Sequence, residues 1–332
     1  MQPRISVVIP VYNMDSTVEG SARSVLNQTF KDFELILIDD GSTDGTPSIL
    51  DAIASEDGRV RVIHQANKGL SGARNVGVKN ARGEFIAWLD ADDQMQPKAL
   101  EKMITAIDET GADVAICNYV NVDRQGNSKR RYPQTENTVI TGREALNKLL
   151  DRSLTQALWA NLARTSVYRT FTFPEGRHFE DVWTSYHLYE QAKKVACVYD
   201  AELFVRLVRD ESVSHVKRIA ERVASCEAYL TRQADLNTRL PETEQAFVKY
   251  NCASLLLELR AAVFRDSKDA FENKRESIQR ICRYFRDHKS YACKGRNLAF
   301  RLEYLGLTAG TRFGFLFSRL ISIPRKNGTW LR

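Results

Sequence analysis

The stretch FELILIDDGSTDGT, residues 33–46, passes directly from an apolar run into a polar turn that contains glycine. A short, unbroken apolar run bounded by turn residues is typical of a strand that is buried on both faces of a parallel sheet. The turn predicts a helix start, with Thr46 as the N-cap and Pro47 at the first helical position. The stretch therefore predicts a buried strand, a turn and a helix, in that order.

The same alternation continues on both sides of this stretch. Apolar runs predict further strands at 5–12, 60–65, 84–93 and 113–122. Helical spacing predicts helices at 15–28, 47–56 and 97–110, and residues 67–81 are predicted as a loop that runs into a helix. Such an alternation with short connections favours an α/β domain with a mostly parallel sheet, flanked by helices as in Rossmann-like folds. Polar clusters close four of the strands: Tyr12-Asn13, Asp39-Asp40, Asn67-Lys68 and Asp90 to Asp93. Because ligands bind at the carboxyl ends of parallel strands, we expect one shared site.

The pattern changes after about residue 210. Before this point, helices are predicted at 142–152, with Thr141 as N-cap, and from about Glu180 to 192. One or two strands are predicted within 198–216. Beyond that point the chain contains long helical stretches at 219–238, 243–264 and 269–287. A length of 332 residues fits about two domains. We place them at 1–212, which contains the polar strand ends, and 213–332, a basic and mainly helical region.

The composition excludes several classes of protein. With 43% hydrophobic and 27% charged residues, the chain is neither disordered, collagen-like nor a small disulfide scaffold. No window of 18 uninterrupted apolar residues predicts a spanning helix, and the first apolar run lacks the cleavage site of a signal peptide. The six cysteines lack metal-ligand or redox spacing, which favours reduced thiols and a cytoplasmic location.

The C-terminal region is strongly basic. Residues 289–332 contain nine Lys and Arg but a single acid, Glu303, among leucines and aromatic residues. This mixture fits an interfacial helix on an anionic membrane surface, here the inner face of the cytoplasmic membrane. Packing of this helix against the front domain fits equally well, and a homodimer contact is a further alternative. No nucleic-acid-binding module is present in the sequence, so nucleic acid is the poorer interpretation.

Three acidic or basic motifs suggest chemistry, each with an ordinary alternative. In LDADD (89–93), two carboxylates one residue apart lie on one face of an extended segment and suit Mg²⁺ or Mn²⁺ with diphosphate oxygens; the alternative is a solvated acidic turn. A carboxylate at Asp39-Asp40 could accept a hydrogen bond from a uracil N3–H or from a ribose hydroxyl. The alternative is an Asp turn that caps a helix. Arg74 could contact a phosphate through its fork of donors, or be a surface arginine.

A fourth motif lies further along the chain. In HFEDVW (178–183), a carboxylate at a helix start beside aromatic residues could act as general base toward an incoming hydroxyl. The alternative is that Glu180 and Asp181 only compensate the charge of the helix N-terminus.

Together these motifs resemble a known family. The segments SVVIPVYN, SVLNQTFKDFELILIDDGSTDGT, NKGLSGARNVGVKNARGEFIAWLDADD and HFEDVW occur in this order within residues 4–210. They resemble the family-2 nucleotide-sugar glycosyltransferases of bacteria, which have the GT-A fold and are mostly inverting. The spacing of WANLARTSVY, HFEDVWTSYHLY and ESVSHV, with the basic tail, is most similar to enzymes that build lipopolysaccharide core or capsule, nearest to a lipopolysaccharide-core glucuronosyltransferase.

The resemblance implies roles at matching positions. For the nucleoside it implies Pro10, Val11, Tyr12 and Asp40, with Asp40 on the uracil. For the uridine–diphosphate channel it implies Asn67, Gly72 and Arg74. In the D-x-D motif it implies Asp90 and Asp92, with Asp92 as the direct ligand of Mn²⁺ or Mg²⁺ and Asp93 as its substitute. Asp181 would be the catalytic base, with Glu180 alongside.

On the acceptor side the resemblance implies Trp159, Asn161, His178 and His215. The chain has W-A-N-L where the family often has W-x-K-L, so the pattern departs from the family at Asn161. His215 could also approach the diphosphate or the metal, with an ordinary buried or surface histidine as the alternative.

The implied function is inverting, metal-assisted transfer of a sugar from a UDP-sugar to a hydroxyl of a cell-surface glycan or glycolipid. Two alternatives stay open. A nucleotidyltransferase would carry a glycine-rich, basic loop after the first strand, where this chain has VYNMDSTVEG (11–20). A non-catalytic UDP-sugar-binding scaffold would not need the full carboxylate set at 40, 90, 92 and 181.

Overall fold

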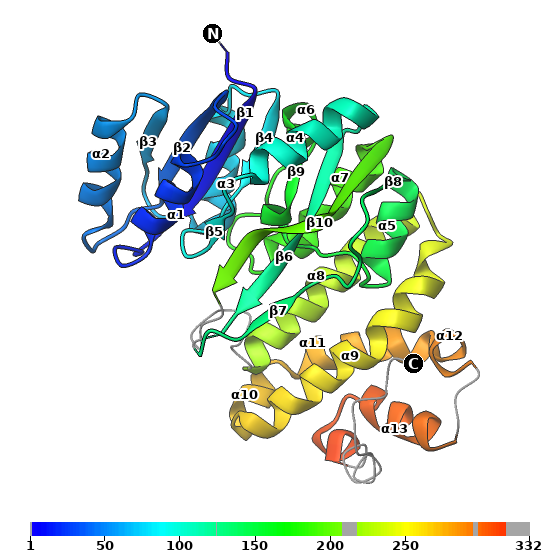
Figure 1. Cartoon of the computed structure of the whole chain (residues 1–332). Helices are drawn as coiled ribbons and strands as arrows, with labels where there is room; N and C mark the ends of the chain where they lie inside the picture. The colour runs from blue at the N-terminus through cyan, green and yellow to red at the C-terminus, as the bar shows by residue number, and fades with distance from the viewer. Residues whose placement is uncertain (1, 124, 208–217, 295–297, 317–332) are drawn as a thin grey trace. The chain divides into compact units, whose positions relative to one another are not determined.

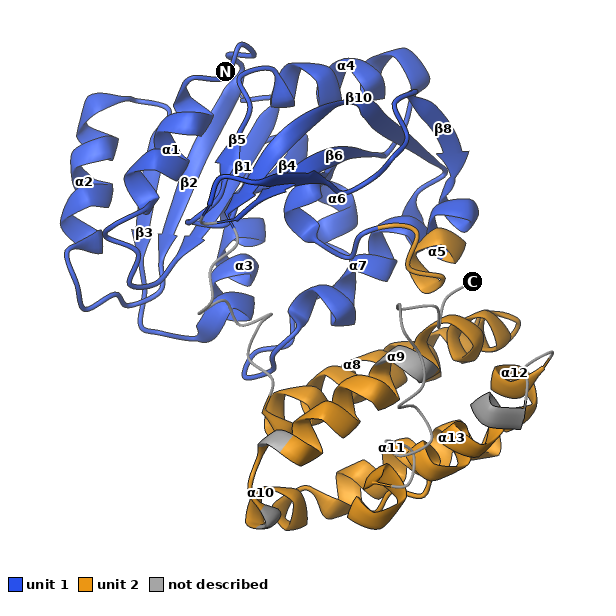
Figure 2. Ribbon diagram, turned by 60° about the horizontal axis from the view of Figure 1, so that its bottom comes forward, with its two compact units in different colours: residues 1–146, 155–210 blue, residues 147–154, 211–332 orange. Residues whose placement is uncertain are grey.

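The computed structural model describes residues 2–123, 125–207, 218–294 and 298–316 (Figure 1). The chain divides into two compact units. Unit 1 comprises residues 1–146 and 155–210, and unit 2 comprises residues 147–154 and 211–332 (Figure 2).

The first half of unit 1 is a parallel sheet with helical crossovers. Its strands are adjacent in the order β3-β2-β1-β4 and all run parallel. They are β1 (Ile5–Val11), β2 (Phe33–Asp39), β3 (Val60–His64) and β4 (Phe85–Trp88), connected by α1 (Val18–Leu26), α2 (Thr46–Glu56) and α3 (Gly69–Asn80). Strands β1, β2 and β4 are buried along their whole length, which explains their continuous apolar sequences. The predicted α/β fold is confirmed.

The second half of the sheet is mixed, and the order continues β4-β9-β6-β10-β5. Strand β9 (Asn161–Arg164) lies antiparallel between β4 and β6 (Val114–Val122), while β6 and β10 (Lys194–Leu207) pair in parallel. The strands β5 (Gln94–Met95), β7 (Ser128–Arg130) and β8 (Thr138–Thr141) add antiparallel pairs. Because β9 is antiparallel to both neighbours, β6 and β10 run in the same direction as β1 to β4. Their carboxyl ends therefore reach the same edge of the sheet.

Three local predictions need correction or confirmation. Strand β4 ends at Trp88, not at residue 93, because Asp90 to Asp93 turn back, with the Asp93 N–H donating to the Asp90 carbonyl over 3.1 Å. Thr46 is the first residue of α2 and Gly45 is its N-cap. The Thr46 hydroxyl instead accepts from the Met14 N–H at 2.8 Å. Thr141 does cap α5 (Gly142–Leu150), in reciprocal hydrogen bonds with Glu144.

The remaining elements of unit 1 are α4 (Ala99–Thr110), the 3₁₀ turn η1 (Leu158–Ala160), α6 (Thr165–Tyr168) and α7 (Glu180–Gln191). Unit 2 contains α8 (Ile219–Asn237), α9 (Thr243–Arg265), α10 (Lys268–Asn273), α11 (Arg275–Asp287), α12 (Lys289–Cys293) and α13 (Leu298–Thr308). The helix predicted at 269–287 is thus divided into α10 and α11 at Lys274. In the described parts of the chain, no helix combines the length and apolar character needed to cross a membrane.

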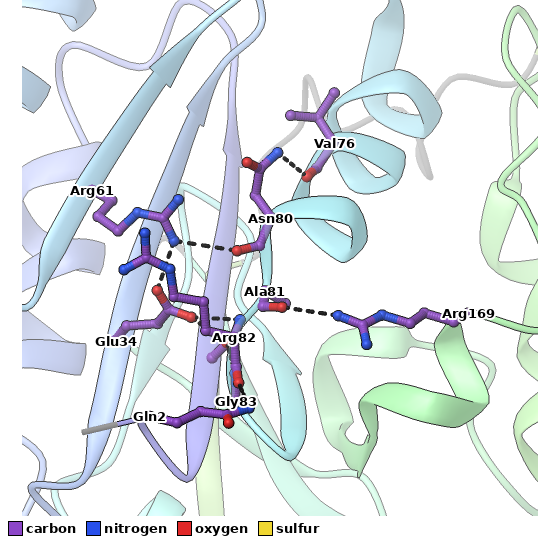
Figure 3. A network of polar contacts seen from close by, with 10 residues as sticks. Gln2, Glu34, Arg61, Val76, Asn80, Ala81, Arg82, Gly83 and Arg169 are labelled. Atoms are coloured by element: carbon purple, nitrogen blue, oxygen red, sulfur yellow. Dashed lines mark hydrogen bonds and ion pairs between the residues drawn. The ribbon is translucent and has the colours of Figure 1, made fainter.

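A buried carboxylate fixes the amino edge of the parallel sheet (Figure 3). Glu34 on β2 accepts from the Ser6 hydroxyl at 2.7 Å and from the Arg82 N–H at 2.8 Å, and it pairs with Arg61 on β3 at 2.8 Å. Gly83 is needed beside it, because a Cβ there would lie 2.5 Å from the Ser6 nitrogen. Strands β1 to β4 are therefore held in register from this edge.

A cavity of about 370 Å³ opens at the same amino edge, lined by Gln2, Pro3, Ala81, Arg82, Gly83 and Arg169. Arg169 donates to the Ala81 carbonyl there at 3.1 Å (Figure 3). This cavity lies at the opposite end of the strands from the polar clusters that the sequence singles out.

Candidate active site

The turn after β2 carries a buried carboxylate that its neighbours hold in one orientation. One oxygen of Asp40 accepts from the Gln65 side-chain amide at 2.6 Å and from the Lys68 N–H at 2.9 Å. The Asp40 N–H donates to the Val11 carbonyl at 2.8 Å. The carboxyl ends of β1, β2 and β3 therefore meet at Asp40.

The loop after β1 is joined to this turn by two further hydrogen bonds. The Asn13 side-chain oxygen accepts from the Thr43 N–H at 2.8 Å, and the Ser42 hydroxyl accepts from the Asn13 N–H at 3.0 Å. Tyr12, just before them, is 46% exposed. Pro10 and Val11, by contrast, are buried in β1. Their side chains shape the sheet, and Val11 contributes through its backbone.

Two glycines leave room for the loop between β3 and α3: Gly41 in the turn after β2, and Gly72 in the first turn of α3. Gly41 has φ +76°, and a Cβ there would lie 2.9 Å from the Asn67 nitrogen. At Gly72, a Cβ would lie 2.4 Å from the Cβ of Lys68. The Asn67 side-chain oxygen accepts from the Gly69 N–H at 3.2 Å. Asn67 and Gly72 thus shape the start of α3, beside Asp40.

Arg74 on α3 lies at the centre of the carboxylate cluster. Its side chain is 3% exposed. One Nη donates to Glu180, and the other lies 3.4 Å from Asp90. The guanidinium also lies over the rings of Trp88, at 5.7 Å, and Phe173, at 5.9 Å. A buried guanidinium requires such partners, because an unpaired buried charge is strongly unfavourable.

The Arg74 fork, which the resemblance implies at the diphosphate, contacts carboxylates in this structure. Both of its Nη atoms are directed at carboxylates of the protein itself. Arg74 therefore links the segment after β4 to the start of α7.

The turn after β4 concentrates negative charge. Burial, with the charges of Asp92 and Glu180, raises the pKa of Asp90, although Arg74 opposes the rise. Burial, with the charges of Asp90 and Asp92, raises the pKa of Asp93 to about 8. Asp93 also accepts from the Leu207 N–H at 3.0 Å, which anchors the turn to the end of β10.

These residues fit a divalent cation shared with a diphosphate. Within the described ranges, no group of three or more His, Cys, Asp or Glu side chains is arranged to hold a metal ion on its own. Mg²⁺, however, is commonly bound by one or two carboxylates together with substrate phosphates. The carboxylate oxygens of Asp90, Asp92 and Asp93 are the hard donors that such a cation prefers.

Asp181 lies at the first turn of α7. Phe179, the N-cap of this helix, has φ +64°, a left-handed conformation that a bulky residue adopts only when its surroundings impose it. One oxygen of Asp181 accepts from the Val182 N–H at 2.8 Å. Burial, followed by the charge of Glu180, raises the pKa of Asp181 to about 7. A carboxylate that titrates near neutral pH is matched to general-base catalysis.

The residues predicted on the acceptor side lie in different surroundings. Trp159 is buried against the ring of Tyr119, with the centroids 4.5 Å apart. Asn161 is 1% exposed, and its amide bonds to the Ala157 carbonyl at 2.8 Å and to the Tyr189 hydroxyl at 3.1 Å. Both are core residues, so a contact between Asn161 and an acceptor does not match its burial.

His178 is exposed, and its carbonyl accepts from the Trp183 indole at 3.3 Å, next to Glu180 and Asp181. His215 lies outside the described residues.

Two residues that the sequence pattern did not single out lie at this edge of the sheet. The charge of Arg206, near the end of β10, acts on Asp90 and Asp93 and opposes the rise in their pKa values. His64 ends β3 and bonds to Asp39. His64 had a sequence signal, since it ends a strand next to Gln65 and Asn67. Arg206 had none, because its placement depends on the pairing of β10 with β6.

The chain is similar to several known proteins. Residues 6–173 match the family model described as glycosyl transferase family 2. The glycosyltransferase GlyG of Streptococcus pneumoniae is 33% identical over 216 residues, which cover 60% of this chain and 69% of GlyG. The putative glycosyltransferase EpsH of Bacillus subtilis is 32% identical over 257 residues, 75% of this chain and 70% of EpsH.

Among solved structures, residues 1–349 of TarS from S. aureus in complex with UDP-GlcNAc superpose with a TM-score of 0.74 at 19% identity. The superposition covers 96% of this chain and 90% of that one, so the two share a fold.

Proposed function

This chain belongs to glycosyl transferase family 2 and is a glycosyltransferase, and from that premise we propose that it transfers a sugar from a UDP-sugar to a hydroxyl of a cell-surface glycan or glycolipid. One observation carries the proposal: Asp40, the Asp90–Asp93 turn and the Glu180–Asp181 pair gather at one edge of one sheet, with the buried Arg74 joining the last two. Membership of the family favours this reaction over nucleotidyl transfer and over a scaffold without activity.

The uridine would bind over the ends of β1 to β3. The fixed carboxylate of Asp40 is suited to accept from the N3–H of uracil, and the exposed ring of Tyr12 offers an apolar surface for the base. The UDP-GlcNAc bound by TarS, which shares the fold, supports a uridine nucleotide as the donor.

The diphosphate would lie at the Asp90–Asp93 turn. A divalent cation held by Asp92, with Asp93 or Asp90 as a second ligand, would supply positive charge that stabilises the UDP leaving group. Arg74 contributes by binding Glu180 and Asp90, which keeps two carboxylates in place without leaving their charge unpaired.

Asp181 would act as the catalytic base. Its carboxylate removes the proton from an acceptor hydroxyl while that oxygen attacks the anomeric carbon, and the bond to the UDP oxygen breaks on the opposite face. One direct displacement inverts the anomeric configuration. A pKa of about 7 keeps much of Asp181 ionised at neutral pH and able to accept a proton.

UDP release from a panel of UDP-sugars, including UDP-glucuronic acid, with and without Mn²⁺, tests the proposal. The wild-type chain and Asp92→Ala are measured side by side. Metal-dependent release from one sugar, absent in Asp92→Ala, supports the proposal and identifies the donor. If no UDP-sugar of the panel releases UDP, UDP binding is measured by titration. Absence of UDP binding overturns the uridine donor. If UDP binds, transfer is measured with acceptors from lipopolysaccharide core or capsule.

For unit 2 we propose binding to an anionic membrane surface at the inner face of the cytoplasmic membrane. On α13, Leu305 is 66% exposed and Leu302 is exposed beside it. Glu303, the one acid in residues 289–332, is fully buried and pairs with Arg260 at 3.2 Å. The accessible ionic groups in the described part of this region are therefore basic, which suits anionic lipid. A homodimer contact is the alternative.

A further inference from the structure

His64 at the end of β3 bridges two carboxylates. Its Nδ1 lies 2.7 Å from Asp39, and its Nε2 lies 3.2 Å from Asp51 on α2. Ionised carboxylates accept hydrogen bonds but cannot donate them. Both ring nitrogens must therefore carry a proton, so the bridge exists only when His64 is an imidazolium ion.

The charged groups that face His64 come from the two elements packed against it. They are Asp39 on β2, which is buried, and Asp51 on α2, which is exposed. The hydrogen bonds to Asp39 and then to Asp51 raise the pKa of His64 above its ordinary value of 6.5. Burial opposes ionisation of Asp39, but the hydrogen bonds with His64 and Ser42 hold its pKa below the usual range.

Asp39 connects His64 to the turn that is proposed to bind the donor nucleotide. Its second oxygen accepts from the Ser42 N–H at 2.9 Å, and the Ser42 hydroxyl accepts from the Asn13 N–H. Asp40, proposed to bind uracil, lies between Asp39 and Ser42 in the sequence. The turn at residues 40–43 is thus attached to β3 through Asp39 and to the loop after β1 through Asn13.

We propose that His64 is a positioning residue for the nucleotide: through Asp39 it holds the turn at residues 40–43 in the conformation that receives the uracil of a uridine nucleotide. The inference rests on the proposed UDP-sugar donor. His64 itself does not touch the nucleotide in this role.

The role has a pH signature that an ordinary packing residue lacks. Below its raised pKa, His64 is charged and bonded to both carboxylates. As the pH rises through that value, the bond to Asp51 and the positive charge beside Asp39 are lost, and the turn loosens. UDP affinity should therefore fall by about threefold to tenfold, the effect of one hydrogen bond.

The test measures UDP affinity by calorimetry between pH 5.5 and about 9 on four full-length proteins: wild type, His64→Gln, Asp51→Asn and Glu56→Gln. Asp51→Asn keeps an acceptor oxygen but removes the charge, so the fall in affinity should move to lower pH. His64→Gln should bind weakly at pH 6 and should lack the fall. Glu56→Gln changes an exposed carboxylate of α2 that pairs with Arg23, so it should match wild type.

UDP itself titrates in this range, but equally for all four proteins, so the differences between them carry the result. Identical profiles of UDP affinity against pH for wild type, His64→Gln and Asp51→Asn overturn the role of His64 but not the proposed donor. Absence of UDP binding to wild type at every pH overturns the proposed donor, and with it this role. Thermal unfolding of His64→Gln checks that it is folded, and Asp51→Asn, at an exposed position, carries the test independently.

Discussion

Arg74 on α3 and Glu180 at the start of α7, 106 residues apart in the sequence, form a buried ion pair. The same guanidinium faces Asp90, next to the proposed metal ligands. The position of Asp181, which follows Glu180 directly, therefore depends on an electrostatic contact between α3 and α7.

This ion pair should show strong coupling in a double-mutant cycle. Arg74→Met or Glu180→Met alone leaves a buried charge without its partner and should lower the free energy of unfolding by about 3 kcal/mol. The double variant removes both charges, so its loss should be smaller than the sum of the two single losses by about 1 kcal/mol or more. Urea denaturation of the full chain, followed by tryptophan fluorescence, measures all four proteins.

The exposed pair of Arg23 and Glu19 on α1 provides the control. The same substitutions there should show no measurable coupling, because solvent screens exposed pairs. Additive losses at Arg74 and Glu180 would contradict the interpretation of Arg74 as the residue that holds the cluster together.

Asp181→Asn should abolish sugar transfer while leaving UDP affinity nearly unchanged. The amide keeps the shape of the side chain and its acceptor for the Val182 N–H, but it cannot take a proton. Loss of a general base lowers kcat by about 10²- to 10⁴-fold. Steady-state transfer and a UDP titration separate the two effects. Glu109→Gln, an exposed carboxylate on α4, is the control. Transfer at the wild-type rate by Asp181→Asn would rule out the base assignment.

The pH profile of transfer should follow the ionisation of Asp181. A base must be deprotonated to act, and burial raises the pKa of Asp181 to about 7. The rate should therefore increase roughly tenfold per pH unit below that value and become level above it. The measurement is kcat between pH 5.5 and about 8.5 at saturating donor and metal. A rate that does not change across this range is the contrary outcome.

The parallel half of the sheet could be predicted because its strands are buried on both faces. Burial of β1 and β2 on both sides requires unbroken apolar sequence, which is visible in ISVVIPV and FELILID. The polar residues after each strand then mark the carboxyl edge, so Asp40 and Asp90 could be placed at one site before any coordinates were known.

The rest depends on contacts between distant segments. Strand β9 has only four residues, NLAR, and its place between β4 and β6 follows from pairing that no local pattern records. Arg74 was expected to contact a phosphate, and sequence alone does not show that Trp88, Phe173 and Glu180 surround it. Asn161 was expected near an acceptor for the same reason, although Tyr189 holds it in the core.

Asp92→Ala should remove sugar transfer and its metal dependence together. Asp92 is the second carboxylate of the D-x-D motif, which we assign as the direct metal ligand. Loss of the cation removes the charge that stabilises the departing UDP, so kcat should fall by at least about 10²-fold. A Mn²⁺ titration of transfer activity measures this, with Glu109→Ala as the control. An Asp92→Ala enzyme that retains a wild-type response to Mn²⁺ would shift the assignment to Asp93 and Asp90.

Leu305→Glu should weaken binding to anionic vesicles. Leu305 is the more exposed of the two exposed leucines on α13. Burying a leucine in lipid stabilises binding by about 1.5–3 kcal/mol, so the substitution should reduce binding at least about tenfold. Flotation with phosphatidylglycerol–phosphatidylcholine vesicles measures the bound fraction, and phosphatidylcholine vesicles test the contribution of charge.

A point substitution is a sharper test of this surface than removal of the tail, because Tyr304 and Leu307 on the same helix are buried in unit 2 and a truncation would expose the core beneath them. Val139→Glu, at an exposed apolar position on β8 in unit 1, is the matched control and should float like wild type. Binding should also weaken with added salt, since screening reduces the attraction of basic groups to anionic lipid. Equal flotation of Leu305→Glu and wild type would contradict a lipid contact through α13. If the molecular mass of wild type increases with concentration and that of Leu305→Glu does not, this face binds a second copy of the chain.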